Sequence, residues 1–105
     1  MKIAMPLAEG RVAAFYDDCD RFTIVDVDLT ENRILDSRRK TPDPEWLGRL
    51  AFWLAEQTVD LVIAVEVSPE MKTALADRNI RMIAGAPNDS PHPVIKSYLA
   101  GDLDR

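Results

Sequence analysis

The sequence has few of the residues that usually build metal and redox centres. Its 105 residues include one cysteine and one histidine. A single cysteine cannot form an internal disulfide, which agrees with a reducing compartment. The longest apolar run is too short to cross a bilayer, and the amino-terminal residues lack the long apolar stretch of a secretory signal. We therefore expect a cytoplasmic protein that has no membrane partner.

The charge balance disfavours nucleic acid as a partner. The chain has 18 acidic residues against 13 lysines and arginines, which gives a formal net charge of −5. Such a protein repels the phosphates of nucleic acid, so we expect no nucleic-acid partner. With 47% hydrophobic residues, the chain is long enough to bury one core, and we expect residues 1–105 to form a single domain.

The most informative stretch is an apolar run followed by a helix start. Val59–Val65 is almost uniformly apolar and rich in β-branched residues, which predicts a strand that is covered on both faces. Ser68 is a good N-cap and Pro69 suits the first helical position, so a helix is expected from Pro69 to about Arg78. Open α/β sheets place ligands at the carboxyl ends of such strands. The sheet edge near Glu66 is therefore the first candidate for a functional site.

The remaining pattern predicts further strands and helices in the order β-β-β-α-β-α-β-α. The short connection Leu29–Glu31 indicates that the strands on either side of it form an antiparallel hairpin. Residues 7–20 show no regular pattern and are expected to be irregular. The other strands are expected at Lys2–Pro6, Phe22–Asp28, Asn32–Ser37 and Ile80–Ala84, and the other helices over Pro93–Ala100 and from near Pro44 through a stripe formed by Leu47, Leu50, Ala51 and Leu54.

Several of these segments resemble one protein family. They are Lys2–Pro6, Cys19–Asp28, Val59–Ala64, Ile80–Ala86 and Ser97–Leu103. The chain is similar, over nearly its whole length, to the dinitrogenase iron-molybdenum cofactor biosynthesis family. The resemblance implies a three-layer, ribonuclease H-like α/β fold whose five-stranded mixed sheet has the order 3-2-1-4-5. It also implies a small protein that carries or helps to insert iron-molybdenum cofactor, its precursors or related metal-sulfur clusters.

In that topology four strands point the same way, and their following loops meet at one edge of the sheet. The residues predicted to gather there are Cys19, Arg38, Arg39, Lys40, Glu66, Asn88 and His92. Cys19 is the first candidate metal ligand because iron-sulfur chemistry prefers soft thiolates, and His92 is the second. The basic run, Arg38–Lys40, would attract an anionic cluster.

Each of these candidates also has a structural interpretation. Cys19 could pack as a small hydrophobic residue, His92 could be a solvated loop residue, and the basic run could be a solvated strand end and linker. The acidic cluster formed by Asp17, Asp18 and Asp20 is expected to be a turn rather than a cation site.

Two functions follow from the sequence. The first is a non-catalytic carrier or accessory protein that binds an iron-molybdenum or other iron-sulfur cluster, as a monomer or homodimer, with a cluster-donating or cluster-accepting protein as partner. The second is a divergent family member without a cluster site, acting as a protein-interaction or regulatory module. The stretch Phe15-Tyr16-Asp17 motivates the second, because the family often has His-Phe-Gly there. No set of acid, base and nucleophile indicates an enzyme.

Overall fold

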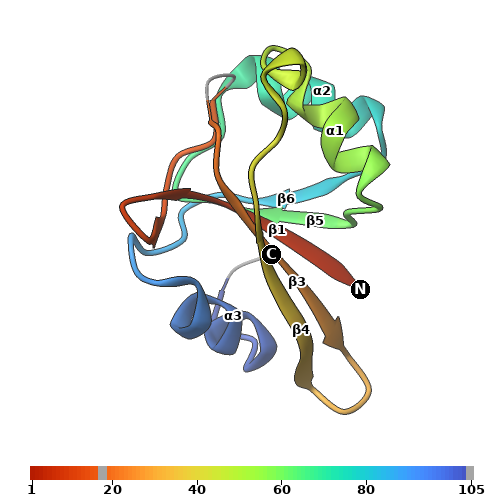
Figure 1. Cartoon of the computed structure of the whole chain (residues 1–105). Helices are drawn as coiled ribbons and strands as arrows, with labels where there is room; N and C mark the ends of the chain where they lie inside the picture. Colours follow the sequence, from red (N-terminus) through yellow and green to blue (C-terminus); the bar gives the residue numbers. More distant parts are fainter. Residues whose placement is uncertain (17–18, 104–105) are drawn as a thin grey trace.

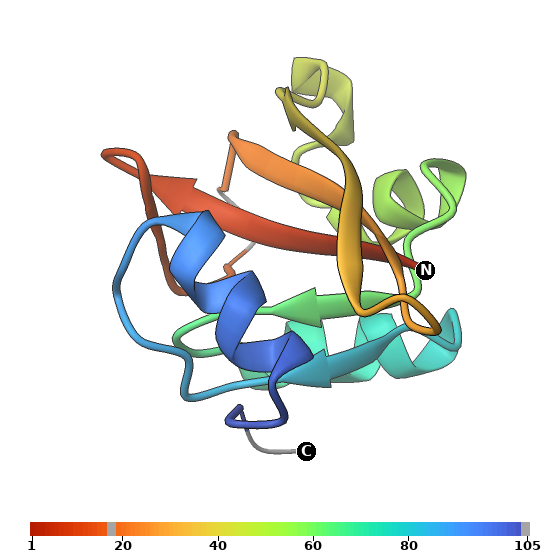
Figure 2. The same ribbon diagram turned by 90° about the horizontal axis from the view of Figure 1, so that it is seen from below.

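The computed structural model describes residues 1–16 and 19–103, which form a β-sheet between two helical layers (Figure 1). The helices α1 (Leu50–Glu56) and α2 (Pro69–Asp77) cover one face of the sheet. The helix α3 (Pro91–Leu99) covers the other face (Figure 2). No helix in the described part of the chain is both long and apolar enough to span a membrane.

The sheet has the order β4-β3-β1-β5-β6, and an additional short strand pairs with the end of β1. Strand β3 runs antiparallel to both of its neighbours, whereas β1, β5 and β6 are parallel. The arrangement confirms the predicted α/β class, the order 3-2-1-4-5 and the hairpin. The strands are β1 (Lys2–Ala8), β2 (Arg11–Val12), β3 (Phe22–Asp28), β4 (Arg33–Lys40), β5 (Leu61–Ile63) and β6 (Arg81–Ile83).

The sheet separates two hydrophobic cores. Alternation along β1 points Ala4 toward α1 and α2, and Ile3 and Met5 toward α3. We call the first cluster the α1/α2 core and the second the α3 core. In β5, Val62 belongs to the α1/α2 core and Leu61 to the α3 core, which confirms that this strand is buried on both faces.

The segment expected to be irregular contains β2, which was not predicted. Leu7 pairs with Val12 across a hairpin whose two central residues are Glu9 and Gly10. Both have positive φ, 54° and 78° respectively, as a primed two-residue turn requires. Glycine adopts such angles without steric cost, and Gly10 is the one local signal for this turn.

The prediction that β1 ends at Pro6 was wrong. Proline lacks an N–H donor, but its carbonyl can still accept a hydrogen bond. Here the Pro6 carbonyl accepts from the Ala13 N–H at 2.9 Å, and the Leu7 N–H donates to the Arg21 carbonyl at 2.9 Å. The strand therefore continues through the proline to Ala8.

The first helix starts later than predicted. Pro44–Trp46 forms a 3-10 turn, and Gly48 then adopts a φ of 83° that ends the helical path. Helix α1 begins only at Leu50. As a result Leu47, which the helical spacing placed in the core, is 45% exposed.

The two later helices follow their predicted signals closely. The Ser68 hydroxyl accepts from the Met71 N–H at 3.3 Å, which confirms the N-cap of α2. Asn79 has a φ of 59° just beyond α2, as expected for a helix end. Helix α3 begins at Pro91 instead of Pro93, so His92 lies in its first turn.

Candidate functional site

The carboxyl end of β5 is covered by the segment that follows β2. The Val65 N–H donates to the Ala13 carbonyl at 3.0 Å, and the Phe15 N–H donates to the Glu66 carbonyl at 2.7 Å. The Ser68 N–H then donates to the Phe15 carbonyl at 3.2 Å. Residues 13–15 therefore run beside the residues that connect β5 to α2 and satisfy their backbone groups.

Phe15 anchors this covering segment to the core. Its side chain is fully buried in the α1/α2 core. The Phe15 ring meets the Phe22 ring edge to face, with centroids 5.5 Å apart, and Phe22 lies 5.3 Å from Trp53 of α1. This aromatic chain fixes the position from which Tyr16 and Cys19 project at the sheet edge.

Tyr16 and Glu66 form a polar pair on this edge. The Tyr16 hydroxyl donates to Oε2 of Glu66 at 3.2 Å, and both side chains are exposed. The hydrogen bond to Glu66, followed by the negative charge of the same carboxylate, raises the pKa of Tyr16 above its usual value of 10.0. Tyr16 is therefore a protonated donor at neutral pH.

Cys19 lies just beyond Tyr16 and is partly buried against the α1/α2 core. Its Sγ accepts from the Tyr16 N–H at 3.5 Å, and the thiol donates to the Ala14 carbonyl at 3.3 Å. The loop backbone thus holds the sulfur near the Tyr16–Glu66 pair. The predicted association of Cys19 with the edge near Glu66 agrees with this geometry.

The basic run belongs to β4 and does not form a linker. Arg38, Arg39 and Lys40 pair in register with successive residues of β3. Because side chains alternate along a strand, Arg38 and Lys40 lie on one face of the sheet and Arg39 on the other. The run therefore does not act as one patch of charge.

Two members of the basic run are engaged within the chain. Arg38 forms an ion pair with Asp36 at 2.7 Å, and Nζ of Lys40 donates to Oε1 of Gln57 at 2.9 Å. Both line a hollow of about 170 Å³ on the side of α1, together with the carboxylates of Asp26 and Asp36. The mixed charges of this hollow do not favour an anionic ligand.

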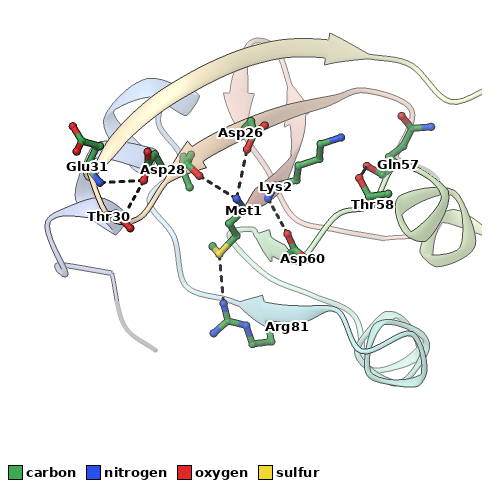
Figure 3. A network of polar contacts seen from close by, with 11 residues as sticks. Met1, Lys2, Asp26, Asp28, Thr30, Glu31, Gln57, Thr58, Asp60 and Arg81 are labelled. Carbon is green, nitrogen blue, oxygen red and sulfur yellow. Dashed lines mark hydrogen bonds and ion pairs between the residues drawn. The ribbon is translucent and has the colours of Figure 1, made fainter.

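A separate polar network closes the opposite edge of the sheet (Figure 3). The amino group of Met1 lies 3.5 Å from the Asp26 carboxylate, and the Lys2 N–H donates to Oδ2 of Asp60 at 3.0 Å. Arg81 reaches the sulfur of Met1 at 3.7 Å. These contacts connect β1 to β3, to the start of β5 and to β6, and they indicate a structural role.

His92 lies on the other face of the sheet from Cys19. It is exposed in the first turn of α3 and lines a hollow with Val25 and Ile95 of the α3 core. Cys19 packs against the α1/α2 core. The structure therefore does not bring the thiol and the imidazole together, and the sheet lies between them.

The other predicted edge residues have individual roles. Asn88 donates to the Val12 carbonyl at 2.8 Å, and its own carbonyl accepts from Arg11 at 3.1 Å, so it docks a loop onto β2. Asp17 and Asp18 lie outside the described residues, and Asp20 is exposed. Among residues 1–16 and 19–103 there is no group of three or more His, Cys, Asp or Glu side chains that could hold a metal ion.

Sequence reasoning did not single out Tyr16 as a site residue. Its partner Glu66 lies 50 positions away, and no spacing rule connects the two. Only the path of the covering segment across the end of β5 brings them together.

The fold and this edge define a class of protein: a small three-layer α/β domain whose loop edge carries one thiol and no complete metal site among the described residues. Residues 1–101 match the family model described as dinitrogenase iron-molybdenum cofactor. The chain belongs to this family.

Solved structures share the fold at low sequence identity. The protein PH0822 has a TM-score of 0.85 and 17% identity, with coverage of 99% of this chain and 93% of that one. The crystal structure of mj0327 from Methanocaldococcus jannaschii, provisionally described as a dinitrogenase, has a TM-score of 0.77 and 22% identity, with coverage of 99% and 92%. A search of curated proteins finds no match. At these identities the structural matches show the fold alone.

Proposed function

We propose that this protein is a non-catalytic, cytoplasmic carrier or accessory protein that holds an iron-molybdenum or other iron-sulfur-type cluster as transient cargo. Family membership supports the kind of cargo. The observation that carries the proposal is the position of Cys19, whose thiol is held by backbone at the loop edge beside Tyr16 and Glu66. Soft thiolate is the ligand that such clusters prefer.

The donor set determines how a cluster would be held. Cysteine ligates metals in its thiolate form, and this chain has a single cysteine. A single protein ligand suits a cluster that retains its other ligands or shares them with a second protein. Weak attachment of this kind suits a carrier that receives cargo from one protein and passes it to another.

The test is an anaerobic titration of the purified protein with a synthetic iron-sulfur cluster and, separately, with isolated iron-molybdenum cofactor. Uptake is measured by co-elution of iron with the protein and by visible absorbance. We expect the wild type to bind and the Cys19→Ser variant to lose uptake. The control is His92→Ala, which should bind normally because His92 lies on the other face of the sheet.

Equal uptake by Cys19→Ser and the wild type would remove the proposed ligand. Thermal unfolding of both variants is the control for folding: a loss of uptake by a variant that unfolds at the wild-type temperature reports the site.

A second candidate is a family member that binds no cluster and acts as a protein-interaction or regulatory module. The covering segment favours it, because Ala13 and Phe15 bond to the backbone of the residues that follow β5 and satisfy it there. Failure of the wild type to take up either cluster would support this candidate. Its oligomeric state with and without metal, measured by light scattering, would then show whether it pairs with itself.

A further inference from the structure

A hollow of about 360 Å³ lies between α3 and the β3–β4 hairpin, on the sheet face opposite to Cys19. Figure 1 shows α3 beside this hairpin. We call this hollow the α3 groove. Its lining includes Asn32, Arg33, Ile34, His92, Lys96 and Leu99.

The α3 groove combines cationic and apolar walls. His92 and Lys96 are four positions apart on α3 and therefore lie on one side of the helix, and Arg33 lines the groove from the start of β4. Ile34 and Leu99 pack against the α3 core and form an apolar part of the lining. Among the described residues no carboxylate lines the groove, although acidic residues outnumber basic ones in the chain.

The basic side chains of this groove are not neutralised within the described residues. Arg33, His92 and Lys96 form no ion pair and no side-chain hydrogen bond there, whereas Arg38 on the same strand as Arg33 is paired with Asp36. Arginine and lysine side chains that line one hollow attract an anion, because guanidinium and ammonium groups both donate well to phosphate.

We propose that the α3 groove binds a small phosphate monoester, with the phosphate among Arg33, His92 and Lys96 and an apolar body against Ile34 and Leu99. A phosphate monoester has up to two negative charges and three terminal oxygens, which matches several separate donors better than a carboxylate does. The volume lies at the lower end of the range for small-molecule sites. This proposal is independent of the cluster cargo, which involves the opposite face.

Phenyl phosphate is a suitable probe, and the backbone amide chemical shifts of the isotope-labelled protein measure its binding. We expect saturable shifts in the first turns of α3 and in the β3–β4 hairpin. The double variant Arg33→Gln, Lys96→Gln should weaken the apparent affinity by at least about tenfold, because it removes two charged donors. The matched control is Lys72→Gln, an exposed lysine of α2 on the other side of the sheet, which should bind like the wild type.

Two results would overturn the proposal: no saturable shift with phenyl phosphate, or equal affinity in the double variant and the wild type. Inorganic phosphate tests the apolar walls separately. Weaker binding of inorganic phosphate than of phenyl phosphate is expected, and equal binding would contradict the role of Ile34 and Leu99. Cys19→Ser should leave phenyl phosphate binding unchanged, which separates this test from that of the cluster cargo.

Discussion

Replacing Phe15 by alanine tests whether the covering segment is anchored as the structure indicates. Phe15 has no exposed surface, and its ring meets Phe22 at a centroid distance of 5.5 Å. Truncating a fully buried phenylalanine costs about 3 to 5 kcal/mol of unfolding free energy, because apolar contacts are lost and a cavity remains. For a domain of this size, 4 kcal/mol lowers the Tm by roughly 15 to 30 °C.

The matched control is the same substitution at Phe52, which is 48% exposed. Its ring stacks on Arg78, with the guanidinium carbon 3.7 Å from the centroid, and an exposed cation–π contact is worth about 0.5 to 1 kcal/mol. We therefore expect Phe52→Ala to cost about 1 kcal/mol. Urea unfolding followed by tryptophan fluorescence and by circular dichroism measures both variants, since Trp53 lies against Phe22. A Phe15→Ala cost no larger than that of Phe52→Ala would refute the anchoring argument.

Two further substitutions test local interactions at the same edge. Glu66→Gln, made in a Tyr98→Phe background so that one tyrosine titrates, should lower the pKa of Tyr16 toward 10, measured by tyrosinate absorbance; an unchanged titration would contradict the Tyr16–Glu66 bond. Because that pKa is raised in the folded state, the bond stabilises the fold below about pH 10 and is lost as pH rises through the raised value. Ser68→Ala should cost about 1 kcal/mol by leaving the Met71 N–H without its cap, and a cost below about 0.3 kcal/mol in urea unfolding would show that the cap contributes little.

Features that depend on local chemistry could be predicted from the sequence. The β3–β4 hairpin follows from a connection too short for a parallel crossover, and the start of α2 follows from a capping serine before a proline. The lateral order of the strands has no such local signal. It was implied by the family resemblance, and the sheet pairing confirms it.

The errors arise where a backbone constraint outweighs the hydrophobic pattern. Leu47 has the spacing of a core residue, but the left-handed Gly48 redirects the chain before α1 begins. A similar effect produces β2, where Glu9 and Gly10 adopt the positive φ angles of a tight turn. A single glycine in a polar stretch is a weak signal, because it fits an irregular loop equally well.

The candidate site shows a different limit, because topology predicts the edge of a sheet but not the face. Cys19 lies near Glu66 at the predicted edge, through the Tyr16 bridge. His92 does not join them, because α3 packs on the opposite face. Arg39 and Arg38 lie on opposite faces because side chains alternate along β4. This separation could have been predicted from the sequence if the strand had been expected to continue through the basic run.

This separation has a chemical consequence for the two proposed ligands. The Cys19 thiol lies on one face of the sheet and the α3 groove lies on the other, with β1 and β5 buried between them. A metal-sulfur cluster bound through Cys19 would not use His92, and a phosphate held by His92 would not contact the thiol. The two proposed sites share no side chain, so a substitution that removes one site leaves the donor groups of the other in place. Each proposal is therefore decided by its own titration.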